Sequence, residues 1–118
     1  MWIASTSTAL SSTAREIFRN PDNAVFLSSV SAWEIALKHT LGRLPLPEPP
    51  QSYVPRLCEL HGIEPLTLEE EAALHLPRIP DHHEDPFDRM LICQAIIGGM
   101  VLLTPDRVIA RYPARVRW

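Results

Sequence analysis

Residues 85–103, DPFDRMLICQAIIGGMVLL, carry most of the information about the fold. Asp85 has the short polar side chain that caps a helix, and Pro86 suits the first helical position. An apolar helical segment then runs to Ile97 and stops at the glycine pair that follows. The apolar run at 100–103 is of the kind found in strands that are covered on both faces of a sheet. The stretch therefore predicts a helix that leads into a buried strand.

The preceding segments show the same alternation of helix and strand. The apolar run at 24–28 predicts another buried strand, and Ser31 with Glu34 has the spacing of a capping box at the start of the next helix. Residues 63–66 predict a short strand, placed near an edge because Pro65 cannot donate a backbone hydrogen bond. Helices that alternate with short apolar strands indicate an α/β domain with a parallel sheet.

Composition limits the class of protein. The 118 residues, 46% hydrophobic and 21% charged, fit one globular domain over 1–118, and the net charge of -3 argues against a wholly basic nucleic-acid coat protein. The longest apolar stretch, 91–103, is too short for a membrane span, and the start has no signal-peptide pattern. Two cysteines make no disulfide framework, so we expect a cytoplasmic protein.

Three acidic residues lie where a parallel sheet places its ligands, at the carboxyl ends of the strands. Glu34 follows the strand at 24–28, Asp106 follows the strand at 100–103, and Asp88 begins the helix that leads into this second strand. Converging carboxylates suit Mg²⁺ or Mn²⁺, which can activate water and stabilise phosphodiester attack.

Purely structural roles would also suit several of these charged residues. Glu34 and Asp88 each occupy the third position of a predicted helix, where capping alone would account for a carboxylate. The polar cluster at 82–85 favours a solvated loop over a zinc site, because neither cysteine has ligand spacing. A set of C-terminal arginines suits either an RNA backbone or a solubilising face: Arg107, Arg111, Arg115 and Arg117.

Three blocks of sequence resemble VapC-type toxins of the PIN-domain ribonuclease family. SVSAWEIALK at 29–38 with LGRLPL at 41–46 is similar to the second block of that family, and HHEDPFDRMLICQA at 82–95 is similar to the third. VLLTPD at 101–106 is similar to the last block. The resemblance extends over about residues 11–118, with the blocks in the family's order.

The resemblance implies a three-layer α/β/α fold and a ribonuclease toxin of a type II toxin-antitoxin system that depends on Mg²⁺ or Mn²⁺. It also implies an RNA substrate, a cognate antitoxin partner and homodimers. Glu34, Asp88 and Asp106 match the second, third and fourth acids of the family and would be both catalytic and metal-binding. Asp85 lies close enough to assist, although its position also suits a helix cap, and Thr104 matches a hydroxyl residue common before the fourth acid.

One departure concerns the beginning of the chain. The family starts with a central strand that ends in its first acid, whereas no Asp precedes Asp22 here and residues 1–10 are expected to form an irregular lead-in. A missing central strand would leave the strands at 24–28 and 100–103 about 10 Å apart. We favour a start codon upstream of Met1. The alternatives are a truncated, inactive protein that only binds an antitoxin, and a structural α/β module whose acids cap helices.

Overall fold

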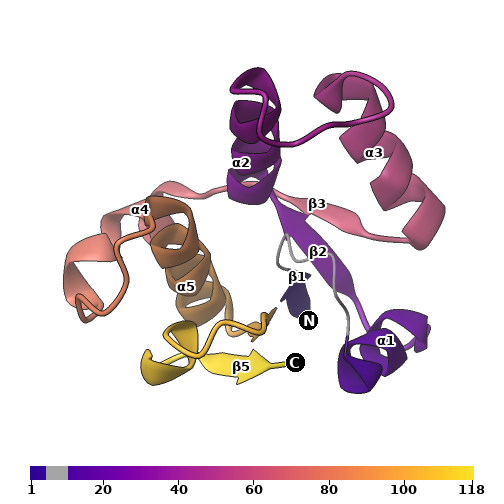
Figure 1. Cartoon of the computed structure of the whole chain (residues 1–118). Helices are drawn as coiled ribbons and strands as arrows, with labels where there is room; N and C mark the ends of the chain where they lie inside the picture. Colours follow the sequence, from indigo (N-terminus) through magenta and orange to yellow (C-terminus); the bar gives the residue numbers. More distant parts are fainter. Residues whose placement is uncertain (5–10) are drawn as a thin grey trace.

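A five-stranded parallel sheet forms the centre of the molecule in a computed structural model that describes residues 1–4 and 11–118. Its strand order is β3-β2-β1-β4-β5, and every neighbouring pair is parallel (Figure 1). The strands are β1 (Trp2–Ala4), β2 (Val25–Ser28), β3 (Glu64–Leu66), β4 (Val101–Leu103) and β5 (Arg115–Arg117). The short parallel sheet confirms the predicted α/β class, and β3 lies at an edge as Pro65 indicates.

Helices connect successive strands, as parallel pairing requires. The α-helices are α1 (Ser12–Arg19), α2 (Ser29–Thr40), α3 (Pro50–His61), α4 (Glu70–Leu74) and α5 (Pro86–Gly98). Two 3₁₀ turns, η1 (Leu76–Arg78) and η2 (Ile109–Arg111), complete the described elements. In Figure 1, α5 and α1 lie on opposite sides of the strands.

Alternating side chains of the central strands divide the core into two layers. Ile3 and Leu102 belong to a cluster that includes Ile92 of α5, whereas Ala4 and Leu103 belong to a cluster with residues of α1. Successive side chains of a strand point to opposite faces, so the sheet is buried on both sides. This arrangement is the three-layer α/β/α fold that the family resemblance implies.

The expectation that the central strand is missing is wrong. Trp2–Ala4 forms β1, which pairs with β2 through Trp2 and Ile3 and with β4 along its whole length. The Trp2 N–H donates to the Ala24 carbonyl at 3.0 Å, and the Val101 N–H donates to the Met1 carbonyl at 3.1 Å. The expected gap with unpaired backbone between β2 and β4 is therefore absent from the described part of the chain. The rest of the expected lead-in, residues 5–10, lies outside the described residues.

The observed starts of α2 and α5 show that neither Glu34 nor Asp88 is the N-cap of its helix. Helix α2 begins earlier than predicted, because Ser28 is its N-cap and accepts the Val30 N–H at 3.0 Å. Glu34 is therefore a residue of the helix interior, and the predicted capping box with Ser31 is wrong. Helix α5 begins as predicted, with Asp85 as N-cap. None of the helices described is long and apolar enough to cross a membrane.

Candidate metal centre

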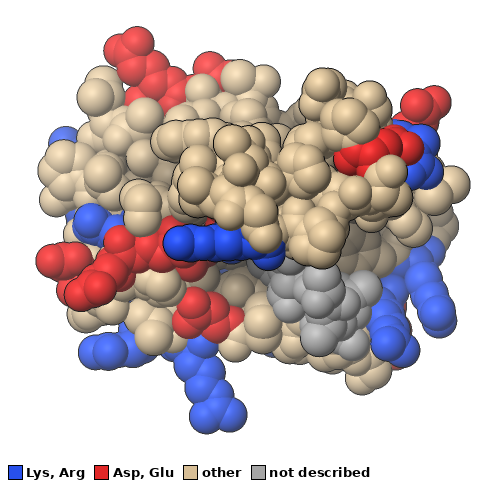
Figure 2. All heavy atoms as spheres, turned by 45° about the horizontal axis from the view of Figure 1, so that its top comes forward, with Lys and Arg blue, Asp and Glu red and all other residues tan. Residues whose placement is uncertain are grey.

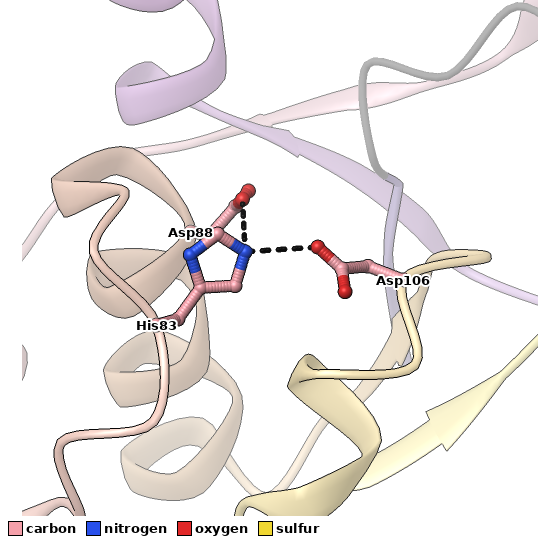
Figure 3. A group of neighbouring side chains, drawn as sticks. All are labelled: His83, Asp88 and Asp106. Carbon is pink, nitrogen blue, oxygen red and sulfur yellow. Dashed lines mark hydrogen bonds and ion pairs between the residues drawn. The ribbon is translucent and has the colours of Figure 1, made fainter.

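Three side chains from separate segments meet beside the carboxyl ends of β1 and β4. His83 comes from the loop before α5, Asp88 from the first turn of α5, and Asp106 from the turn after β4 (Figure 3). One potential ligand atom of each lies within 4.8 Å of the others, and the side chains are all partly buried. Among the described residues, this is the group with the composition and spacing to hold a metal ion.

Asp106 is fixed by the turn that follows β4. Its Oδ1 accepts the Val108 N–H at 2.8 Å, and its own N–H donates to Thr104 Oγ1 at 3.2 Å. Its Oδ2 lies 2.9 Å from His83 Nε2. Burial alone would raise the pKa of Asp106, but the hydrogen bonds from His83 and Val108 outweigh it and lower the pKa. Asp106 is therefore a positioned and ionised carboxylate.

His83 holds its ring between the two aspartates. The Asp85 N–H donates to Nδ1 at 3.0 Å, and since a backbone N–H can only donate, Nδ1 carries no proton in this arrangement. The ring proton is then on Nε2, which lies 2.9 Å from Asp106 Oδ2 and 3.2 Å from Asp88 Oδ2. Burial opposes protonation of the ring, but the aspartates outweigh it and raise the pKa of His83. The donor facing Nδ1 nevertheless favours the neutral ring, which donates from Nε2.

Asp88 carries the least stabilised negative charge of this group. Burial, followed by the charge of Asp85, raises its pKa from 3.8 to about 6, with smaller contributions from Glu34 and Asp106. A protonated His83 would act in the opposite direction and lower this pKa. The side chain is 23% exposed, so water only partly screens the repulsion between these carboxylates. A cation bound to this carboxylate would relieve the repulsion, so such surroundings favour cation binding.

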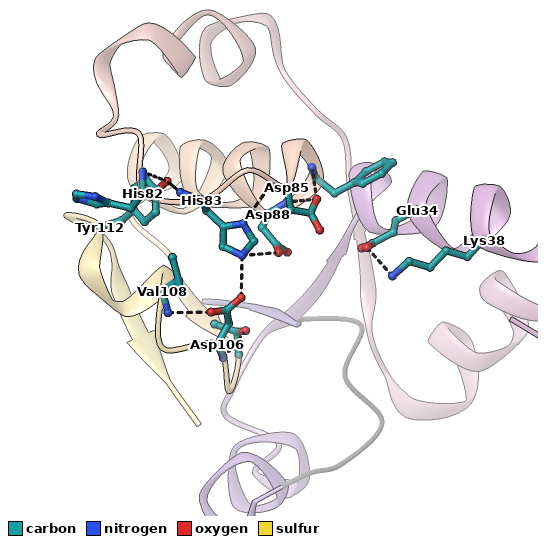
Figure 4. A network of polar contacts seen from close by, with 11 residues as sticks. Glu34, Lys38, His82, His83, Asp85, Asp88, Asp106, Val108 and Tyr112 are labelled. Carbon is teal, nitrogen blue, oxygen red and sulfur yellow. Dashed lines mark hydrogen bonds and ion pairs between the residues drawn. The ribbon is translucent and has the colours of Figure 1, made fainter. Parts of the chain in front are cut away.

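Glu34 lies at the side of the cluster, on α2 (Figure 4). It is only 4% exposed, and its Oε2 forms an ion pair with Lys38 Nζ at 2.9 Å. Its hydrogen bond to Lys38 raises the pKa of that amine. Because the charge of Glu34 also acts on Asp88, the two carboxylates lie within electrostatic range of one another.

The structure brings two of the three predicted metal-binding acids into one cluster and leaves the third beside it. Asp88 and Asp106 share the cluster, whereas Glu34 stands beside it with Lys38. Asp85 caps α5 by accepting the N–H groups of Phe87 at 2.8 Å and Asp88 at 3.4 Å. Since Asp85 performs the capping, capping does not account for Asp88, just as it does not account for Glu34.

Sequence reasoning missed His83, which it assigned to a solvated loop. The loop is instead held to the body of the protein by Tyr112, whose hydroxyl accepts the N–H groups of His82 at 2.9 Å and His83 at 2.7 Å. The His82 ring also makes an edge contact with Tyr112, with 5.2 Å between ring centroids. This long-range contact has no sequence signal beyond a histidine placed five residues before Asp88.

Comparison with known proteins agrees with this fold. A family model described as "PIN domain" matches residues 1–115. The chain is 43% identical over 61 residues to Ribonuclease VapC16 of Mycobacterium tuberculosis (strain ATCC 25618 / H37Rv). That alignment spans 52% of this chain and only 43% of the relative's own length. Because the family match extends over nearly the whole chain, the protein belongs to the PIN-domain family, in which it resembles a VapC-type ribonuclease.

Proposed function

We propose that the protein is a metal-dependent ribonuclease and the toxin of a type II toxin-antitoxin system. The observation that carries the proposal is the meeting of Asp88 and Asp106, which with His83 place potential ligand atoms within 4.8 Å of one another. Burial and the neighbouring acids raise the pKa of Asp88 to about 6 and so add to the argument. A fold gains no stability from such repulsion, whereas a bound cation converts it into attraction. Membership of the PIN-domain family and the name of the similar Ribonuclease VapC16 support the same activity.

The residues of the cluster fit a hard divalent cation. Asp88, Asp106 and Glu34 would hold Mg²⁺ or Mn²⁺ through carboxylate oxygens, the ligands that both ions prefer. A cation bound there supplies Lewis-acid stabilisation of the phosphodiester and lowers the pKa of water. His83 presents an N–H to the aspartates rather than a free nitrogen, so it would act on them as a hydrogen-bond donor and not as a metal ligand.

Neighbouring residues support the acidic centre in distinct ways. Lys38 pairs with Glu34 and limits its repulsion of Asp88. Thr104 is 6% exposed, and its hydroxyl oxygen accepts the Asp106 N–H, which fixes the turn that carries this carboxylate. Asp85 caps α5 and thereby sets where Asp88 leaves the helix. These are positioning roles, and they need no contact with RNA.

The RNA backbone would be bound by exposed arginines. On the face drawn in Figure 2, basic side chains project from the surface close to acidic ones. The four C-terminal arginines predicted for this role are all exposed, on or beside η2 and β5: Arg107, Arg111, Arg115 and Arg117. Guanidinium groups pair well with phosphate oxygens, so binding should weaken as salt is added.

A partner antitoxin, homodimers and a cytoplasmic location complete the proposal. The thiols of Cys58 and Cys93 are free, which suits a reducing compartment. Co-expression with the small protein encoded beside this gene, followed by co-purification and light scattering, would test the first two. Recovery of the protein without its neighbour, as a monomer, would contradict them.

A second candidate is a catalytically inactive protein that only binds an antitoxin. The observation that favours it is the residue that follows β1, which is Ser5 and not an acid. Asp22 is the first aspartate of the chain, so the centre has fewer carboxylates than the family pattern implies. Weaker cation binding and slow or absent cleavage would follow.

Cleavage of a mixed RNA pool in Mn²⁺ separates these candidates. We expect cleavage that is lost on addition of EDTA and lost in Asp88→Asn, but kept in the control Asp22→Asn, which changes an exposed turn. Cleavage that survives both EDTA and Asp88→Asn would contradict the metal mechanism. Absent cleavage with intact capture of the neighbouring small protein would favour the binding protein.

A further inference from the structure

An exposed tryptophan stands beside the acidic centre. Trp33 of α2 is 64% exposed, an unusual position for so large an apolar side chain. Its ring makes an edge contact with Phe87 of α5, with 4.8 Å between centroids and planes at 71°. The contact fixes the orientation of the indole while much of its surface remains open to solvent.

A small pocket lies next to this indole. It has a volume of about 210 Å³, with Trp33, Val30 and Met90 among its apolar walls and with Glu84 and Arg89 as polar members. The pocket is smaller than the roughly 300–1,000 Å³ that drug-sized ligands occupy, and so suits a single planar ring system. A flat apolar wall with polar groups beside it is the chemistry that binds a nucleobase.

Arg89 brings a cationic group to the wall of the pocket. Its Nε is buried and has no hydrogen-bond partner among the residues that the structure describes. The side chain as a whole is half-buried, and its guanidinium has further N–H groups that can donate to a base carbonyl or ring nitrogen. The carboxylate of Glu84 could in turn accept the amino group of a base.

The pocket adjoins the helices that carry the acids. Trp33 directly precedes Glu34 on α2, and Phe87 directly precedes Asp88 on α5. The aromatic contact therefore spans the same two helices whose carboxylates face the centre. A nucleotide whose phosphate reaches the acids can place a neighbouring base at this indole.

We propose that Trp33 and the pocket lined by Arg89 and Glu84 form a subsite for one unpaired RNA base next to the scissile phosphodiester. The proposal rests on the ribonuclease activity proposed above and names what that activity would select. Trp33 stacks on the base, and the two polar side chains contact its edge. An exposed Leu37 lies one turn along α2, so a protein partner that docks on this helix face is the competing outcome of the test.

Cleavage of short RNAs tests the subsite. The substrates are oligonucleotides of one sequence, either intact or with an abasic site at each position in turn, and the variants are Trp33→Ala, Trp33→Phe and the control Leu37→Ala. Loss of a stacking platform should lower kcat/KM for intact RNA about 5- to 150-fold in Trp33→Ala. At one abasic position Trp33→Ala and the native protein should become nearly equal. On intact RNA, Trp33→Phe keeps an aromatic ring and should lose less activity than Trp33→Ala, whereas the control Leu37→Ala should stay close to native.

Fluorescence separates failure of the subsite from failure of the proposed function. Binding of the same oligonucleotides in EDTA, which removes the metal that the proposed cleavage needs, should quench indole emission in the native protein and much less in Trp33→Ala. Quenching without cleavage of any RNA would leave the subsite standing and refute the ribonuclease. Cleavage with no difference between intact and abasic RNA in Trp33→Ala would overturn the subsite. The subsite would also be overturned if Trp33→Ala and Leu37→Ala both cleaved RNA like the native protein but no longer bound a protein partner.

Discussion

Asp88 shows at the scale of one residue how function and stability oppose each other. Its N–H is capped by Asp85. Among the described residues, its carboxylate has His83 Nε2 at 3.2 Å as its polar partner, and it faces the charges of Asp85, Glu34 and Asp106. Burial keeps water from relieving this repulsion fully. The side chain therefore costs the free protein stability, as is common for residues that are prepared to bind a cation.

Asp88→Asn should stabilise the protein in the absence of metal. The pKa of about 6, against an ordinary 3.8, sets an upper limit of about 3 kcal/mol, which partial exposure reduces to about 1–2 kcal/mol at pH 7.5. Since the folded state binds this proton more tightly, stability contributed by Asp88 falls as pH rises from about 4 to 6. Urea unfolding at pH 4 and 7.5 would measure both effects. A less stable Asp88→Asn would show instead that the carboxylate has a structural role.

Mn²⁺ affinity should follow the titration of the same carboxylate. The proton on Asp88 must leave before its oxygen can bind a cation, so affinity should rise between about pH 5 and 7. Calorimetry in two buffers of different ionisation enthalpy would also report the released proton. Affinity that is flat across this range would exclude Asp88 as a ligand.

His83→Ala distinguishes a hydrogen-bond donor from a metal ligand. The Nε2–H of His83 satisfies Asp88 and Asp106, so its removal should free both oxygens and tighten Mn²⁺ binding about 5- to 10-fold. The same change should lower the melting temperature of the metal-free protein. His82→Ala is the matched control, because the His82 side chain contacts Tyr112 and not the aspartates. Weaker Mn²⁺ binding in His83→Ala would identify the imidazole as a ligand.

At the scale of the elements, the residues at which α2 and α5 begin determine where the acidic side chains of these helices lie. Sequence patterns predicted the start of α5 correctly, because Asp85 and Pro86 are a strong and local signal. They placed the start of α2 at Ser31, although Ser28 is the residue that caps it and also hydrogen-bonds Gln94 from α5. Ser28, Ser29 and Ser31 all lie near the start of this helix. Which of them is the cap depends on Gln94, a partner distant in sequence.

Asp85→Ala and Asp85→Asn separate capping from metal binding. Loss of the cap in Asp85→Ala should cost about 1–2 kcal/mol of unfolding free energy, whereas asparagine is an equally good cap. Both changes remove a charge that raises the pKa of Asp88, so that pKa should fall in both. Chemical denaturation and NMR titration of the Asp88 carboxyl would measure these effects. If Asp85→Asn lost Mn²⁺ binding, Asp85 would be a ligand and not only a cap.

The whole molecule depends on a three-residue strand, β1, which is also the element that the sequence predicted least well. The alternation of helices and apolar runs was enough to predict the α/β class, the edge position of β3 and the approach of Asp88 to Asp106. It was not enough for β1, because the three residues Trp2–Ala4 are followed by a stretch of small polar residues and show no periodic pattern. What makes it a strand is tertiary: two neighbours supply its hydrogen bonds, and both faces of the sheet bury it.

Substitution of Ile3 tests the central position of β1. Ile3 is fully buried and packs with Ile92 and Leu102, so Ile3→Ala should cost about 2–5 kcal/mol of unfolding free energy. Ile3→Val should cost about 0.5–1.5 kcal/mol, and Leu60→Ala, at a side chain 69% exposed on α3, should cost little. The Val101 N–H, which donates to the Met1 carbonyl, should exchange with solvent faster in Ile3→Ala than the N–H groups in the middle of α5. An Ile3→Ala protein as stable as Leu60→Ala, with unchanged exchange at Val101, would show that β1 lies outside the core. The gap between β2 and β4 that the sequence predicted would then be real.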